Sequence, residues 1–448
     1  MNCPGRPPAR ARPSQTARAA DRRLWPFRAP SGKERGKGTP VLRRLTPTRP
    51  LPFVELVLLL AALMSMMAFS IDSIMPALPL LAETYSPAAP ERAQLVISAF
   101  VLGTGAGQLL IGPFSDSFGR RPALILGVGL FVGGALLARA AGSLETLLAL
   151  RFVQGTGAAA SRVVSQAVMR DLFSGRAQAR VGSIVFSFFV VIPAVAPLIG
   201  QQVIGFAGWR GLFAVYGWMG IFVLTWFLLR QPETLAPENR RAFRLGRILV
   251  AMREVLATPV ALRYLLVATL GFGQLIGYIS SAQPVFVDAL GAGDRFVYYF
   301  AGVALISGLS GFLNARLVMR LGMRPMASWA FGGQFVLAAT LWLLWQIGAF
   351  DALGQPVQLG IFIAWSVSLF FMNGLTFGNI TALAMEPLGH IAGTASAVIG
   401  ALSSILAVAI AAPIGLAFDG SPRPLILGAA ICSGLAFAFV WSDRKRVR

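Results

Sequence analysis

Long apolar runs alternate with short polar connections along most of the chain. The runs reach about twenty residues or more, the length at which a helix crosses a bilayer with all of its backbone groups hydrogen-bonded. Strands of a membrane barrel are shorter and alternate in polarity. The pattern therefore predicts an all-α membrane protein with twelve transmembrane helices, at residues 53–81, 93–113, 122–141, 144–168, 181–205, 209–229, 261–286, 296–317, 326–349, 357–385, 391–416 and 424–441.

Composition and charge support this interpretation. The 448 residues are 56% hydrophobic and 13% charged, with a mean hydropathy of +0.69, whereas soluble domains carry about 25% charged residues. With alternating spans, basic segments such as Arg120-Arg121 and Arg444-Lys445-Arg446 fall on one side, which is typical of the cytoplasmic side. Both termini are therefore expected in the cytoplasm. The net charge of +21 follows largely from this topology and gives no argument for nucleic-acid binding.

The first fifty residues differ from the rest of the chain. They hold thirteen of the 39 basic residues, only two acids, and many Pro, Gly and Ala residues. Such a composition predicts a disordered cytoplasmic tail, with an organellar targeting segment as the alternative. The resulting scheme has a tail at 1–50, a six-helix bundle at 51–230, a cytoplasmic linker at 231–260, a second six-helix bundle at 261–442 and a short tail at 443–448.

Internal echoes indicate that the two bundles arose by duplication. Gly119-Arg-Arg-Pro122 after the second span matches Gly322-Met-Arg-Pro325 after the eighth. Ala196-Pro-Leu-Ile-Gly200 in the fifth span matches Ala412-Pro-Ile-Gly415 in the eleventh. Repeats in this order predict two pseudo-symmetric bundles that face a central cavity and rock against each other.

Two opposite charges lie at membrane depth in the first bundle only. Asp72 is about 12 Å from the outer end of the first span, and Arg151 is about 10 Å from the outer start of the fourth. A charge at this depth is costly, so it is expected to face protein or a water-filled cavity. The two side chains can pair directly or through water, either as a structural ion pair or as a site for a coupling proton. Pro76 and Pro79 predict an interruption of the helix just outside Asp72.

The connection between the second and third spans, Gly112–Pro122, combines glycines with charges. Gly112 is expected to allow a close helix approach, and Gly119 a tight turn. Asp116, Arg120 and Arg121 provide charges at the membrane surface that can pair differently in two conformations, which predicts a gating loop. The alternative is an ordinary solvated loop.

Further candidates are polar or helix-bending groups inside the spans. Pro193, Pro197 and Gly200 predict a bending or closely packed fifth helix, with packing alone as the alternative. Apolar walls with a few polar groups suit small lipophilic molecules. The candidate cavity residues are Gln154, Gln274, Tyr278, Gln283, Asn373, Asn379 and Phe371, which can equally serve helix packing.

Catalytic and metal-binding signals are weak. Two cysteines and one histidine, His390, predict neither a disulfide framework nor a metal site. A surface or capping role is the better interpretation of His390. The sequence has no nucleophile–base set and no phosphate-binding loop, so no cofactor, no enzyme and no ATP-driven pump is predicted.

Several of these motifs resemble one family of transporters. The chain is similar, over about residues 50–445, to the major facilitator superfamily and in particular to its Bcr/CflA group of drug–proton antiporters. The motifs that carry the resemblance are Asp72–Pro79, Gly112–Pro122, Leu150–Ala160, Val168–Asp171, Pro193–Gly200, Gly208–Arg210, Pro232–Leu235 and Met385–Ser396.

The resemblance implies the major facilitator fold and proton-coupled efflux of small lipophilic drugs or toxic metabolites. It links Arg151 to proton transfer, and Pro193, Pro197 and Gly200 to the direction of antiport. It also implies a monomer in the bacterial inner membrane whose partners are lipid, protons and the substrate. The alternative is an importer or proton symporter of a small metabolite.

Overall fold

The computed structural model describes residues 51–240 and 242–444, and every regular element in these ranges is a helix. The predicted tail at 1–50 lies outside the described residues. All of the helices belong to one compact unit within residues 45–448. Apolar sequence explains the helices, because a chain without water around it must satisfy its backbone hydrogen bonds internally.

The N-terminal helices are α3 (Phe53–Asp72), η1 (Met75–Ala77), α4 (Leu78–Tyr85), η2 (Pro90–Gln94), α5 (Leu95–Phe118), α6 (Arg120–Ala138), α7 (Leu144–Leu172) and α8 (Gly175–Arg230). The connection holds η3 (Pro237–Asn239) and α9 (Leu245–Ala257). The C-terminal helices are α10 (Pro259–Pro284), η4 (Val285–Ala289), η5 (Gly293–Arg295), α11 (Phe296–Leu321), α12 (Met323–Gln346), α13 (Gln355–Met385), η6 (Glu386–Ile391), α14 (Ala392–Leu416) and α15 (Arg423–Arg444).

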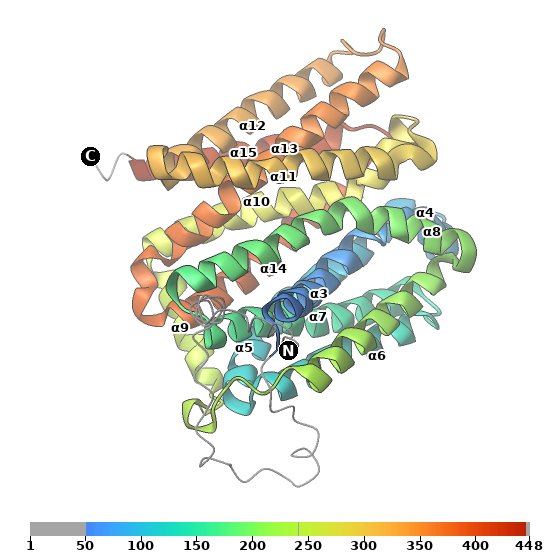
Figure 1. Cartoon of the computed structure of the whole chain (residues 1–448). Coiled ribbons are helices and arrows are strands. Elements are labelled where there is room, and N and C mark those ends of the chain that lie inside the picture. Colours follow the sequence, from blue (N-terminus) through green and yellow to red (C-terminus); the bar gives the residue numbers. More distant parts are fainter. Residues whose placement is uncertain (1–50, 241, 445–448) are drawn as a thin grey trace, which may run out of the picture. The chain divides into compact units, whose positions relative to one another are not determined.

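Contacts divide these helices into two sets. In the N-terminal set α5 and α6 both pack on α7, while α3 and α6 pack on α8. In the C-terminal set α12 packs on α15, α11 on α13, and α10 on α13, α14 and α15. Figure 1 shows α5, α6 and α7 in one part of the molecule and α11, α12, α13 and α15 in another. The sets meet where α5 contacts α14 and where α8 contacts α11.

Nine helical stretches within the described residues are long and apolar enough to cross a membrane. Val191–Arg230 has 40 residues and Gln355–Leu416 has 62, so each is about two crossings long. Helix α7, which carries Arg151, is not among the nine because it is less apolar than the others. The protein is therefore all-helical and membrane-spanning, and the count of twelve spans and the side of the termini stay predictions.

Two predicted interruptions are present. Helix α3 ends at Asp72 and gives way to the 3₁₀ turn η1 and to α4, which hold Pro76 and Pro79 in their first turns. Proline lacks a backbone donor, so the helical hydrogen-bond ladder cannot continue through it. Helix α8 is broken at Gly208, whose φ is 64°, and this lies between the predicted fifth and sixth spans.

Candidate functional site

A buried polar cluster lies where α3, α7 and α8 meet. The Asp72 side chain at the end of α3 is 3% exposed, and Arg151 on α7 is fully buried. Arg151 Nη1 donates to Gln154 Oε1 (2.8 Å), Nη2 to the carbonyl oxygen of Ser70 (3.0 Å), and Nε to that of Val96 (3.3 Å). Its guanidinium also lies 4.4 Å from the centre of the Phe100 ring. Neutral groups therefore hold this cation in place.

The expected pairing of Asp72 with Arg151, directly or through water, stays a prediction. Within residues 51–240 and 242–444 no ion pair joins the two side chains. Instead Arg151 binds the backbone of Ser70, two residues before Asp72. The Tyr216 hydroxyl of α8 shares a 2.8 Å hydrogen bond with the hydroxyl of Ser73, the residue after Asp72. Tyr216 therefore links α8 to the end of α3.

The cluster has unused hydrogen-bonding capacity. Ser70 Oγ and Gln154 Nε2 are buried and have no partner among the described residues. A buried polar atom without a partner costs free energy, and such atoms are usually satisfied by water or a ligand. The predicted cavity residue Gln154 thus belongs to the charged cluster, where it orients Arg151.

The fifth-span motif packs directly on this cluster. A Cβ atom at Gly200 of α8 would lie 2.2 Å from the carbonyl oxygen of Ser73, next to Asp72. Glycine is therefore required for α8 to lie against the end of α3. Pro193 and Pro197 lie inside α8, where the only non-helical residue recorded in this helix is Gly208. Close packing is therefore found at Gly200 and the break of the helix at Gly208, while the role of the motif in transport stays a prediction.

A network of charges lies at the junction of α5 and α6, where Gly119 alone separates the two helices, so the predicted loop Gly112–Pro122 is helical apart from this residue. Arg120 donates to Asp116 (2.6 Å) and to Asp171 of α7 (2.9 Å), and it is 5% exposed. Gly119 has a φ of 112°, as its tight turn requires. The expected close approach at Gly112 is wrong, because no described atom lies within 4 Å of a Cβ placed there. The sequence alone does not show whether a glycine lies on the side of its helix that contacts another helix.

Glu233, in the segment after α8, was not among the predicted site residues. Its carboxylate accepts the backbone N–H groups of Arg120 (2.9 Å) and Arg121 (3.0 Å) at the start of α6. A carboxylate at a helix N-terminus is stabilised by unpaired N–H donors and by the helix dipole. Thr234 also donates to Asp171. The segment after α8 thus binds the junction of α5 and α6. In the sequence, only the Pro232–Leu235 motif pointed to this segment.

The other candidate cavity residues do not gather in one place. Gln274 accepts from Ser433 (3.0 Å), and Asn379 donates to Asn314 (2.9 Å), so both serve helix packing. Tyr278 is fully buried among aromatic rings of α11 and α13. Gln283 is buried near the end of α10, and Phe371 of α13 is half-buried. Of the seven candidates, one, Asn373, lines the pocket described next.

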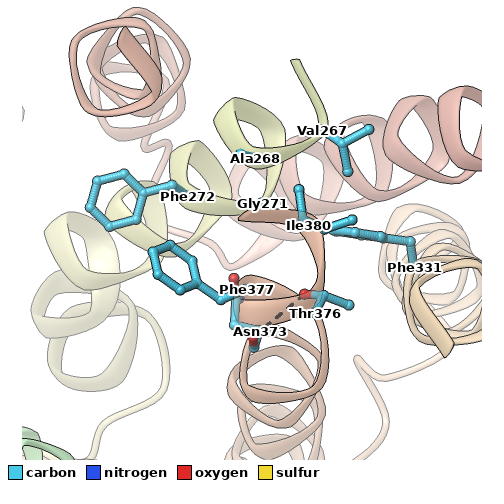
Figure 2. Close-up of a pocket in the computed structure, with 9 residues that line it drawn as sticks. All are labelled: Val267, Ala268, Gly271, Phe272, Phe331, Asn373, Thr376, Phe377 and Ile380. Atoms are coloured by element: carbon cyan, nitrogen blue, oxygen red, sulfur yellow. Dashed lines mark hydrogen bonds between the residues drawn. The ribbon is translucent and has the colours of Figure 1, made fainter. Parts of the chain in front are cut away.

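Figure 2 shows this pocket between α10, α12 and α13. Asn373 Nδ2 donates to its own helix, while Oδ1 lies 3.8 Å from a Cβ placed on Gly271 across the pocket. The space left inside it is about that of one water molecule, far below the roughly 300–1,000 Å³ of sites for drug-sized ligands. None of the lining residues is charged: Val267, Ala268, Gly271, Phe272, Phe331, Asn373, Thr376, Phe377 and Ile380.

Metal-binding groups do not assemble in the part of the chain that the structure describes, where no three His, Cys, Asp or Glu side chains converge. His390 Nε2 lies 2.6 Å from Glu254 Oε1 of α9, and the imidazole is 64% exposed. This is a surface contact between the connection and η6, in keeping with the expected surface role of His390.

Comparison with known proteins identifies the family. Residues 58–412 match the family model of the Major Facilitator Superfamily. The chain belongs to this superfamily. It is 30% identical over 399 residues to the "Bicyclomycin resistance protein homolog" of Haemophilus influenzae, covering 88% of this chain and 97% of that protein. It is also 30% identical to the "Chloramphenicol resistance protein" of Pseudomonas aeruginosa, covering 78% and 81%. The recognition of the superfamily and its drug-resistance group is confirmed.

Solved structures agree on the fold. A D-xylose-proton symporter superposes with a TM-score of 0.69 at 16% identity, covering 87% of this chain and 97% of that one. The human organic anion transporter MFSD10 gives 0.58 at 19%, covering 87% and 99%. These likenesses support the fold alone. The superfamily consists of transporters rather than enzymes, so this chain is a multi-pass membrane transporter.

Proposed function

We propose that this transporter exports small lipophilic compounds in exchange for protons across the bacterial inner membrane. Residues 51–230 and 261–442 form its two rocking bundles, 231–260 the linker, and both termini face the cytoplasm. The chain works as a monomer. The names of its bacterial relatives, which refer to resistance to bicyclomycin and chloramphenicol, support export of such compounds.

One observation carries the proposal: Asp72 and Arg151 are both buried and Arg151 binds the backbone two residues before Asp72, yet no ion pair joins the two side chains within the described residues. A structural ion pair would hold both charges at contact distance, since an unpaired buried charge is costly. Asp72 instead lies at the last residue of α3, and the hydrogen bonds of Arg151 go to neutral acceptors. This arrangement suits a carboxyl group that carries a proton in one conformation and releases it in another.

The proposed cycle follows from differential stability of two conformations. Asp72 takes a proton from the outer side, and the neutral carboxyl favours return to the conformation open to the cytoplasm. Loss of the proton to the cytoplasm and binding of cargo then favour the outward-open conformation. The inward proton supplies about 2.3 kcal/mol per 100 mV of membrane potential.

The neutral pocket of the C-terminal helices supports a lipophilic cargo. Phe272, Phe331 and Phe377 supply apolar walls, and Asn373 Oδ1 supplies one acceptor. In the conformation described, the space between these side chains is about that of one water molecule, so a cargo requires the pocket to open. An opened pocket with this lining suits an uncharged aromatic group with a hydroxyl or amide donor.

Transport in proteoliposomes tests the proposal. Under an imposed pH gradient, Asp72→Asn should abolish proton-coupled movement of a fluorescent lipophilic cargo while membrane insertion is unchanged. Glu83→Gln is the matched control, because Glu83 of α4 is exposed. Unchanged coupling in Asp72→Asn contradicts the proton site. Cargo and protons moving in the same direction would instead support a metabolite symporter.

A further inference from the structure

Helices α5 and α14 pack against each other across the boundary between the two helix sets. A Cβ atom at Gly105 of α5 would lie 2.8 Å from Ile405 Cγ1 and 3.0 Å from the carbonyl oxygen of Ala401, both on α14. Small residues at such positions let two helix backbones approach closely. The halves therefore meet along a line of close contact, which we call the α5–α14 seam.

Two glutamines of the N-terminal set each face a glycine of α14 along this seam. A Cβ at Gly415 would lie 2.5 Å from Gln94 Oε1, and one at Gly400 would lie 3.0 Å from Gln108 Oε1. Both glutamine side chains are buried. Gln94 immediately precedes α5, on the side predicted to face outward, while Gln108 lies fourteen residues farther along. Uncharged amides thus line both ends of the seam.

The two ends differ in their hydrogen bonds. Gln94 Oε1 accepts a 3.1 Å bond from the hydroxyl of Ser281 on α10, and both residues are buried. Gln108 Nε2 is buried and has no partner within the described ranges. A hydrogen bond between buried groups is strengthened by the low dielectric, whereas an unpaired buried donor is a cost. The seam is therefore fastened at the Gln94 end.

We propose that Gln94 stabilises the conformation of the transporter that is closed on the predicted outer side. Its bond to Ser281, formed in the space that Gly415 leaves free, holds the predicted outer ends of the halves together. This bond breaks when the transporter opens to that side. The inference rests on the proposed function, because it requires the halves to move. The seam glycines make the closed contact possible, and the glutamine makes it reversible.

Gln201 of α8 provides a natural comparison. Its Nε2 donates across the same boundary to the carbonyl oxygen of Asp294, at 3.3 Å. This bond is exposed, so water can replace it with little loss. Comparison of Gln94→Ala with Gln201→Ala therefore distinguishes the effect of a buried hydrogen bond from that of a solvent-exposed one.

Spin-label distances in the full-length protein test the inference. One label is placed at Ala88, before η2, and one at Ala417, at the end of α14; both residues are exposed. Cys3 and Cys432 are first replaced by serine. Distances are measured in proteoliposomes without cargo or a pH gradient, so that they report the conformational equilibrium alone. The conformation in which Gln94 is bonded to Ser281 should give the shorter distance between the two labels.

Gln94→Ala should raise the ratio of long to short distances roughly two- to tenfold, the effect of one buried neutral hydrogen bond. Gln201→Ala should leave the ratio almost unchanged. Gly415→Ala should also favour the long distance, because its methyl group would meet Gln94 Oε1. The double variant Gln94→Ala/Gly415→Ala should resemble Gln94→Ala alone, since the obstructing atom is gone.

Two results would overturn the inference: a ratio that Gln94→Ala does not change, or an equal rise for Gln94→Ala and Gln201→Ala. A glutamine that only fills space in the closed contact predicts the first result. Absence of proton coupling in the transport assay would contradict the proposed function without altering these distances. The two proposals can therefore fail separately.

Discussion

The close contact between Gly200 of α8 and the end of α3 makes a quantitative prediction. A Cβ at position 200 would lie 2.2 Å from the carbonyl oxygen of Ser73. To reach an ordinary contact distance, α8 must move away by about 1.3 Å, since optimal contacts lie near 3.5 Å. The obstructing atom belongs to the backbone, so no side-chain rotation relieves the clash. Gly200→Ala should therefore destabilise the fold by about 1–3 kcal/mol, as overpacking usually does.

The displacement should also reach the proton site. Ser73 adjoins Asp72, and its hydroxyl is bonded to Tyr216 on α8, so moving α8 strains this hydrogen bond beside Asp72. A misplacement of about 1 Å can lower a rate roughly a hundredfold. Thermal unfolding in detergent measures the stability, and pH-gradient-driven efflux in proteoliposomes measures the activity. We expect both to fall for Gly200→Ala.

Gly205→Ala is the matched control, because Gly205 lies on the same helix with no described atom within 4 Å of its added methyl group. There the better helix propensity of alanine should leave stability equal or slightly higher. If Gly200→Ala unfolds at the same temperature as Gly205→Ala and transports normally, the packing of α8 on Ser73 does not position the site. If both variants lose stability and transport, the cause is a general sensitivity of α8 to substitution rather than the contact with Ser73.

Three further predictions concern other parts of the chain. Glu233→Ala should destabilise the start of α6 by about 1–2 kcal/mol, measured by thermal unfolding, whereas Glu238→Ala, at an exposed position in η3, should not. Gly271→Ala should fit without strain and fill the pocket, raising KM for an aromatic cargo up to about tenfold, with Gly378→Ala as the control in open space. Deletion of residues 1–45 should leave transport per inserted molecule unchanged; a large loss would assign the tail a role.

Sequence reasoning predicted the parts of the fold that depend on local pattern. Apolar runs located the helices, and Pro76 and Pro79 located the break after Asp72. The charges of the Gly112–Pro122 segment were expected to pair, without named partners, and Asp116 pairs with Arg120; whether the pairs change between two conformations stays a prediction. These features follow from composition and short-range spacing, which a single sequence contains.

Facing directions and long-range partners could not be predicted in this way. Gly112 and Gly200 look alike in sequence, yet one has open space beside it and the other touches a backbone oxygen. Glu233 lies 113 residues from the N–H group of Arg120 that it binds. The pocket is lined by neutral side chains from three helices, and such residues cannot be distinguished in sequence from those that face lipid.

The position of Asp72 explains how a proton could act on the contact between the halves. Helix α3 ends at Asp72, and the turn η1, which begins three residues later, contacts both α8 and α10. Helix α10 also carries Ser281, the partner of Gln94. In the proposed cycle the charge on Asp72 therefore changes next to η1, a short segment that contacts both halves. Coupling between protonation and the α5–α14 seam then needs no chain of contacts through a helix bundle, because η1 lies between Asp72 and the helix that carries Ser281.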